Sequence, residues 1–254
     1  MTVVGVLHPG EMGAEVAGAL RERGETVLWA SAGRSGATAE RAQAAGLEDA
    51  GDIGEVCRSS EILLSICPPH AALDVARATS GFTGIYVDAN AVSPAAARAV
   101  GEGFARFVDG GIVGPPPSRP GTTRLYLSGG EAERIAALFA GTNVDARVIS
   151  AEPGAASALK AAYAGWTKGS AALLLTVREL ARAEGVEDAL LEEWRLSLSE
   201  LEERLPGAER SARRKGWRWI GEMEEIARSL AAQDLPTGFH EAAAEVFRRA
   251  AEES

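Results

Sequence analysis

The 254-residue sequence has little cysteine, no long apolar run and no excess of positive charge. Its two cysteines, Cys57 and Cys67, are too few for a disulfide framework and lack the spacing of metal ligands. No stretch approaches the ~18 uninterrupted apolar residues that a membrane span requires. A formal net charge of −10 argues against a nucleic-acid-binding or anionic membrane-binding surface. We therefore expect a cytoplasmic protein with reduced thiols, no bound metal and a small-molecule substrate.

Lysine is also rare, because only three of the 26 lysine and arginine residues are lysines. They are Lys160, Lys168 and Lys215. Burial readily lowers the pKa of a lysine, so a lysine can exchange a proton near neutral pH, whereas an arginine stays charged. We single out Lys160 as the candidate for catalysis, since it lies in an otherwise alanine-rich helical segment. The alternative is a surface lysine whose stem covers apolar neighbours.

Apolar strand-like segments alternate with helical segments up to about residue 150. The predicted strands are 2–7, 25–31, 61–67, 84–90, 106–114 and 123–130. This alternation predicts an α/β Rossmann fold with a doubly wound, mainly parallel sheet. Strand patterns then nearly vanish, and the predicted helices are 155–185, 186–205, 207–233 and 239–253, with Pro206 and Pro236 at or beside boundaries. We expect two domains, an α/β domain at 1–152 and an all-α domain at 153–254.

The turn after the first strand lacks the first glycine of a G-x-G-x-x-G dinucleotide-binding motif. Residues 8–13 read His-Pro-Gly-Glu-Met-Gly, so Gly10 and Gly13 keep the second and third glycines. Those glycines allow close approach of the diphosphate and close helix–strand packing. We expect His8 to have a strained backbone with positive φ, which histidine tolerates better than most residues. The helix that follows still offers unpaired N–H groups to a diphosphate, although a plain strand–helix turn is the alternative.

An acidic residue is missing where an NAD site needs one. Such a site carries Asp or Glu about 20 residues beyond the turn, bonded to the ribose 2′-hydroxyl. Residues 26–38 contain no acid and instead offer Ser31, Arg34 and Ser35. A guanidinium and two hydroxyl groups suit a 2′-phosphate. The sequence therefore predicts NADP as the cofactor, with NADPH preferred over NADH, unless Arg34 is simply a surface residue.

Five segments, taken together and in order, resemble the β-hydroxyacid dehydrogenase superfamily. This superfamily includes 6-phosphogluconate dehydrogenase, 3-hydroxyisobutyrate dehydrogenase and the imine reductases. The segments are similar to its G-x-M-G turn (9–13), its cofactor-lining strand end (64–69), its Asp-x-Ser-Thr-x-x-Pro stretch (87–94), its Asp-Ala-Pro-Val-Ser-Gly-Gly substrate loop (108–117) and its catalytic G-x-x-x-x-x-K-x-x-x-N helix (154–165). The last hundred residues resemble an uncharacterised, phosphogluconate-dehydrogenase-like C-terminal helical domain.

The resemblance implies an NAD(P)-dependent dehydrogenase with Lys160 as general acid/base and a homodimer formed through the helical domain. The cofactor-binding residues expected from the motifs and from the resemblance are Pro9, Gly10, Glu11, Met12, Gly13, Ser31, Arg34, Ser35, Cys67, Pro68 and Asn90. The expected substrate-binding residues are Gly111 and Gly114, through backbone N–H groups, and Tyr163 and Thr167, which share a helix face with Lys160.

Two departures from the superfamily pattern leave the function open. Val113 and Ala164 stand where the superfamily has a serine and an asparagine. The first interpretation is an enzyme acting on a small hydroxy or keto acid. The second is an imine reductase-like enzyme that reduces C=N bonds, which is disfavoured because such enzymes commonly carry a proton donor other than lysine at position 160. The third is a non-catalytic NADP-binding sensor.

Overall fold

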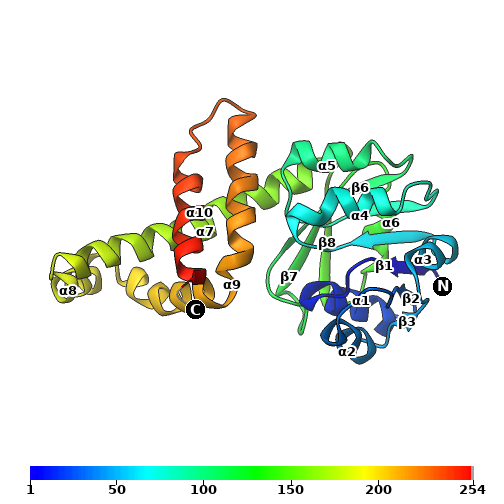
Figure 1. The fold of residues 1–254 in the computed structure, drawn as a ribbon, viewed down its shortest axis with the longest axis horizontal. Helices are drawn as coiled ribbons and strands as arrows, with labels where there is room; N and C mark the ends of the chain where they lie inside the picture. Colours follow the sequence, from blue (N-terminus) through cyan, green and yellow to red (C-terminus); the bar gives the residue numbers. More distant parts are fainter. Residues whose placement is uncertain (253–254) are drawn as a thin grey trace. The chain divides into compact units, whose positions relative to one another are not determined.

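The computed structural model describes residues 1–252, which divide into two compact units (Figure 1). The first unit is Met1–Lys160, and the second begins at Ala161. The division falls inside a long helix, α7 (Ala155–Ala183). The sequence boundary after residue 152, where strand patterns stop, stays a prediction.

Residues 1–160 contain an eight-stranded sheet with the order β3-β2-β1-β4-β5-β6-β7-β8. The strands are β1 (Val3–Val6), β2 (Thr26–Trp29), β3 (Glu48–Asp49), β4 (Ile62–Ser65), β5 (Ile85–Asp88), β6 (Phe107–Val113), β7 (Thr123–Ser128) and β8 (Val144–Ser150). Neighbouring strands pair in parallel except β6 with β7. The prediction of a mainly parallel Rossmann sheet is confirmed.

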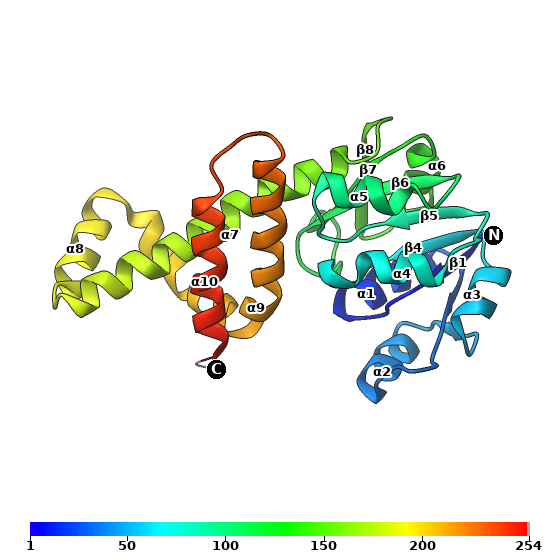
Figure 2. The same ribbon diagram turned by 45° about the horizontal axis from the view of Figure 1, so that its top comes forward.

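Helices cover both faces of this sheet (Figures 1 and 2). They are α1 (Glu11–Glu22), α2 (Gly36–Ala44), α3 (Ile53–Ser59), η1 (Pro69–Ala71), α4 (Ala72–Ala78), α5 (Pro94–Gly101) and α6 (Ala132–Leu138). One apolar core joins the sheet to α1, α2 and α6, and a second joins it to α3, α4 and α5. Strand order reverses between β1 and β4, so the carboxyl ends of these two strands border the crevice where such sheets bind ligands.

The second unit is helical, as predicted. It contains the rest of α7 with α8 (Glu187–Ser197), α9 (Ser199–Ala231) and α10 (Gly238–Glu252). Among residues 161–252, the main apolar core joins α7, α9 and α10 around the fully buried Met223 and Phe247. No helix within residues 1–252 is long and apolar enough to cross a membrane.

The predicted helix boundary at Pro206 is wrong, because α9 continues through this residue. A proline inside a helix removes one backbone hydrogen bond and costs about 3 kcal/mol. The adjacent Leu205 is buried against Leu174 and Trp194, and this packing offsets the cost. The chain breaks instead at Leu198, whose φ of −144° and ψ of 53° are not helical.

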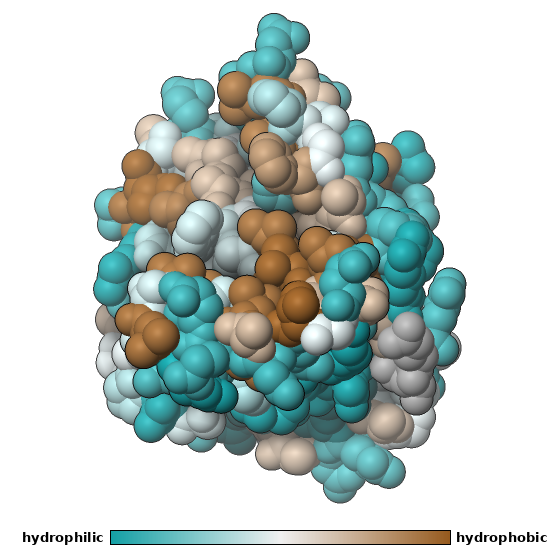
Figure 3. Space-filling model, turned by 90° about the vertical axis from the view of Figure 1, so that its left-hand side faces the viewer, coloured by the Kyte–Doolittle hydropathy of each residue, from teal (hydrophilic) through white to brown (hydrophobic). Residues whose placement is uncertain are grey.

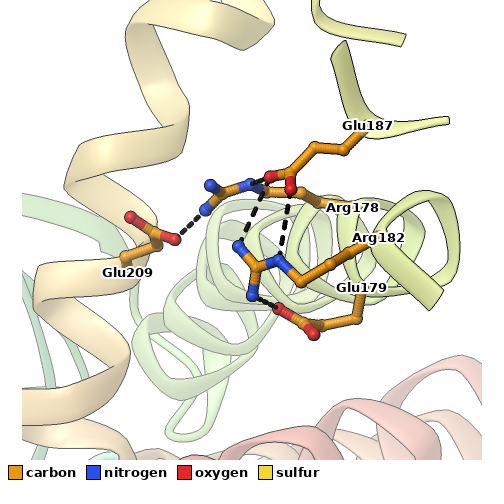
Figure 4. A network of polar contacts seen from close by, with 5 residues as sticks. All are labelled: Arg178, Glu179, Arg182, Glu187 and Glu209. Atoms are coloured by element: carbon orange, nitrogen blue, oxygen red, sulfur yellow. Dashed lines mark hydrogen bonds and ion pairs between the residues drawn. The ribbon is translucent and has the colours of Figure 1, made fainter. Parts of the chain in front are cut away.

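Charged side chains tie the end of α7 to its neighbours (Figure 4). Arg178 donates to Glu187 at 2.7 Å, and it also pairs with Glu209 of α9. Arg182 donates to Glu187 at 3.2 Å and to Glu179 at 2.8 Å. One carboxylate, at the start of α8, therefore binds two arginines that lie one helical turn apart on α7.

Candidate functional site

The turn after β1 closes without the positive φ expected at His8. Among residues 1–252, Asp234 is the one non-glycine residue with positive φ, at 54°. The Gly10 N–H donates to the His8 carbonyl at 2.9 Å, which shapes the turn. A Cβ at Gly13 would lie 2.2 Å from the same carbonyl oxygen. The turn thus requires a glycine at position 13, because any side chain there would clash. It does not require a left-handed backbone at residue 8.

Gly10 differs from Gly13, because nothing in the protein requires a glycine there. A Cβ at Gly10 would meet no atom within 4 Å, and its φ of −73° suits any residue. Gly10 is the N-cap of α1 and supplies no side-chain cap to the first turn of the helix. An open backbone at a helix N-terminus, beside the point where strand order reverses, fits a diphosphate that approaches the main chain.

The other predicted residues of this turn, Pro9, Glu11 and Met12, differ in their exposure to solvent. Pro9 is buried, and Glu11 is exposed in the first turn of α1. Met12 packs against the apolar core beneath the turn. These positions anchor the turn on the sheet while its outer side stays accessible.

The residues after β2 are hydrogen-bonded within the protein. The Thr38 N–H donates to the Ser35 hydroxyl at 3.3 Å, which caps α2. The Ser31 N–H donates to Asp49 Oδ1 at 3.2 Å, and the Gly51 N–H donates to the same oxygen at 2.8 Å. Hydrogen bonds from Gly51 and Ser31 hold the pKa of Asp49 below its usual range. Sequence reasoning missed this carboxylate, because Asp49 is the last residue of the two-residue strand β3 and binds Ser31 from the neighbouring strand's end.

Asn90 links the ends of β4 and β5. Its side-chain amide donates to the Ser65 hydroxyl at 3.0 Å, and its carbonyl oxygen accepts from the Cys67 N–H at 2.5 Å. Asn90 is buried, so it holds the Cys67–Pro68 segment beside the crevice from within the protein. Burial raises the pKa of Cys67 to about 12, which keeps this side chain a thiol.

Asp88 is a second carboxyl group that the sequence did not single out. It is 1% exposed, and its Oδ1 accepts from the Asn90 N–H at 3.1 Å. Its Oδ2 has no hydrogen-bond partner among residues 1–252. Burial, together with the charge of Asp109, raises the pKa of Asp88 to about 7. The end of β5 therefore holds a carboxyl group that is partly protonated near neutral pH.

Asp109 lies on β6, the neighbour of β5, and anchors the first turn of α7. Its Oδ2 accepts from the N–H groups of Gly154 and Ser157 at 2.9 and 3.0 Å and from the Ser128 hydroxyl at 2.9 Å. Its Oδ1 accepts from the Ser157 hydroxyl at 2.5 Å. The Ser128 hydroxyl in turn accepts from the Ala156 N–H at 3.1 Å. A carboxylate at a helix N-terminus also interacts favourably with the helix dipole.

This anchor fixes the position of Lys160. A Cβ at Gly111 would lie 2.7 Å from the Ala156 carbonyl oxygen and 3.0 Å from Lys160 Cβ, so only glycine allows α7 to pack this closely on β6. Lys160 is half-buried there. Gly114 has a φ of 121°, and a Cβ would lie 2.1 Å from the Thr122 carbonyl oxygen. The packing of the protein therefore explains why both positions are glycine, independently of what their N–H groups bind.

Tyr163 and Thr167 follow Lys160 on α7, in the second unit. Tyr163 is exposed, and the Thr167 hydroxyl donates to the Tyr163 carbonyl at 3.0 Å. Ala164 is buried in the helical core, and Val113 is buried at the end of β6. The side chains at the two positions that depart from the superfamily pattern are therefore part of the buried packing of the protein. Lys168 forms an ion pair with Glu222.

Comparisons with known proteins match this architecture along the whole chain. An uncharacterized 28.5 kDa protein in the 7S RNA 5′ region of Methanothermus fervidus is 31% identical over 192 residues, which are 74% of each chain. Residues 181–250 match the family described as a domain of unknown function, DUF1932. The structure of the conserved protein MTH1747, of unknown function and described as similar to 3-hydroxyacid dehydrogenases, aligns at a TM-score of 0.73 and 29% identity over 98% of this chain and 97% of that one.

The chain belongs to the β-hydroxyacid dehydrogenase superfamily. The fold agrees, since Mycobacterium tuberculosis 3-hydroxyisobutyrate dehydrogenase aligns at a TM-score of 0.76 over 100% of this chain and 94% of that one, with 16% identity. As a superfamily member, the chain combines the expected Rossmann sheet with a helical part that includes the DUF1932 region.

Proposed function

We propose that this superfamily member is an NADP(H)-dependent oxidoreductase that interconverts a small hydroxy acid and the corresponding keto acid. The open backbone at Gly10 carries the proposal. The packing of the protein does not require a glycine at this position, since a Cβ would meet no atom within 4 Å. Gly10 is also the N-cap of α1, at the crevice between β1 and β4. A glycine that the packing of the protein does not require leaves the main chain open to a dinucleotide at this turn.

The residues around the crevice suggest how the cofactor would be held. The Pro9–Gly13 turn and the N–H groups of α1 would bind the diphosphate, and Ser31, Arg34 and Ser35 would surround the 2′-phosphate. Cys67, Pro68 and Asn90 would line the nicotinamide side. When bound, NADP(H) would supply or accept a hydride.

Lys160 would move the accompanying proton. In oxidation, its neutral Nζ would take the proton of the substrate hydroxyl, and in reduction the ammonium group would return it. Backbone N–H groups at Gly111 and Gly114 would bind the substrate carboxylate. The Asp109 anchor and the close packing at Gly111 would keep the backbone and Cβ of Lys160 in place through the reaction.

A binding and turnover assay tests this function. We expect the protein to bind NADPH more tightly than NADH, and to oxidise NADPH with one or more keto acids in a panel that also contains cyclic imines. Both can be followed through the nicotinamide fluorescence and absorbance. Turnover with imines alone would establish the imine reductase alternative. NADPH binding without turnover on any compound would favour the sensor, and equal affinity for NADH would contradict the NADP assignment.

The helical unit also exposes an apolar stripe that supports a homodimer. The stripe consists of Tyr163, Trp166, Leu173, Val177 and Leu180 of α7, which are 36% to 71% exposed. Their spacing puts them on one helix face over a length of about 25 Å. Figure 3 shows apolar residues grouped among hydrophilic ones on one side of the molecule. Soluble monomers rarely expose a continuous apolar patch, and a second copy of α7 would present an equally long stripe to cover it.

The Leu173→Glu variant tests this dimer. Because a carboxylate in the middle of an apolar interface would lose its hydration, we expect the variant to be monomeric where the wild type is dimeric. Light scattering coupled to size-exclusion chromatography measures the mass. Leu196→Glu is the matched control, since Leu196 is 76% exposed on α8, outside the stripe. A monomeric wild type at micromolar concentration would contradict the dimer.

A further inference from the structure

His8 and Arg34 form a side-chain pair that neither residue's motif predicts. Arg34 Nη1 lies 2.6 Å from His8 Nε2, and Arg34 Nη2 donates to the Leu7 carbonyl at 3.0 Å. The pair joins the turn after β1 to the loop after β2, which are neighbouring strands. His8, which replaces the first glycine of the motif, thus binds Arg34, the residue expected at the 2′-phosphate.

The chemistry of this contact fixes the state of the imidazole. A guanidinium can only donate hydrogen bonds, so His8 Nε2 must accept one and carries no proton. Burial, with a smaller effect from the charge of Arg34, lowers the pKa of His8 to about 4. The ring is therefore neutral at physiological pH, and its single proton sits on Nδ1, which is a donor.

Two donors of this pair have no acceptor within the protein. His8 Nδ1 and Arg34 Nε are both buried, and neither has a hydrogen-bond partner among residues 1–252. Unpaired buried donors destabilise a fold, so two of them in one contacting pair suggest that an acceptor from outside completes the site. One of the two donors carries a positive charge. An anion with several oxygens, such as a phosphate monoester, provides acceptors for both.

The position of the pair indicates which phosphate this is. The diphosphate is expected at Gly10 and the N-terminus of α1, whereas the end of β2 faces the ribose of the adenosine. We propose that His8 is a specificity-determining residue, which together with Arg34 forms a receptor for the 2′-phosphate of NADP(H). This assignment rests on the proposed NADP(H) function. It explains the lost first glycine, because a glycine would leave Arg34 without its imidazole partner.

Binding measurements on three variants test the assignment. His8→Leu keeps the volume of the side chain but removes both nitrogens, and we expect it to weaken NADPH binding at least tenfold while NADH binding changes less than threefold. Arg34→Gln should weaken NADPH binding by a larger factor. His8→Gln should recover most of the affinity, because its amide can accept from Arg34 and donate to the phosphate. Isothermal titration calorimetry gives the dissociation constants, with 2′,5′-ADP and 5′-ADP as probes that lack nicotinamide.

The controls separate this assignment from the proposed function. Arg58→Gln removes an arginine that is 67% exposed on α3, and it should leave both affinities unchanged. Circular dichroism checks that each variant is folded. Equal weakening of NADPH and NADH in His8→Leu, with no recovery in His8→Gln, would make His8 a structural part of the turn and overturn the assignment. A folded wild type that binds neither nucleotide would overturn the proposed function as well.

Discussion

Lys160→Met is expected to lower the turnover number by a factor of about 100 to 10,000, which is the usual contribution of a general acid or base. Methionine has a similar length and no ionisable group, so it removes the proton carrier and preserves the packing over Gly111. NADPH affinity should stay within about twofold of the wild type, because the lysine acts on the substrate. Steady-state kinetics and fluorescence titration of NADPH measure the two effects separately.

Lys215→Met is the control for this experiment, since it removes another of the three lysines, one that lies on α9 in the second unit. It should retain wild-type turnover. Turnover within threefold of the wild type in Lys160→Met would contradict the role of Lys160, even if the protein proves to be an oxidoreductase. A parallel loss of NADPH affinity would instead place Lys160 in cofactor binding.

Asp88→Asn is expected to remove most of a pH dependence of stability between pH 4 and pH 8. The pKa of Asp88 is raised from 3.8 to about 7 in the folded protein, so folding favours the protonated carboxyl. Its contribution is fully present below the unfolded pKa and is lost as the pH rises through the folded pKa. At 1.36 kcal/mol per pKa unit, ionisation lowers the free energy of unfolding by about 4 kcal/mol at pH 8. An asparagine does not ionise and avoids this loss.

Urea denaturation at pH 5 and pH 8 measures the effect. The quantity to compare is the change between the two pH values, because any constant cost of the new amide cancels. Asp74→Asn is the matched control, since the Asp74 side chain is 80% exposed and should leave the pH dependence as it is in the wild type. If Asp88→Asn and the wild type lost stability equally between pH 5 and pH 8, Asp88 would be ionised in the folded protein throughout this range.

Patterns along the chain predicted those features that depend on neighbouring residues. Alternating strands and helices gave the Rossmann sheet, and the spacing of Gly10 and Gly13 located the turn at the crevice. β3 was missed because it has two residues, both exposed, and β8 because its residues are mostly not buried. The helix through Pro206 was missed because the packing of Leu205 outweighs the local preference of proline.

Features that depend on distant residues were not predictable in the same way. Asp109 anchors groups 19 to 48 residues further along the chain, and the strand pattern around it does not reveal which groups it binds. Asp49 and Ser31 meet because β2 and β3 pair. His8 was expected to differ in backbone conformation, whereas the structure gives it a negative φ and a side-chain contact with Arg34. In each case the partner is found only once the sheet has formed.

The anchor at Asp109 and Ser128 also bears on how the protein folds. Starting a helix is the unfavourable step, because several residues must be ordered before the first hydrogen bond forms. At the start of α7, the N–H groups of Gly154, Ala156 and Ser157 donate to acceptors on β6 and β7. The paired strands therefore provide a nucleus from which this 29-residue helix grows toward its C-terminus. We expect the sheet to fold first, and the helical unit to assemble on a helix whose starting point is already set.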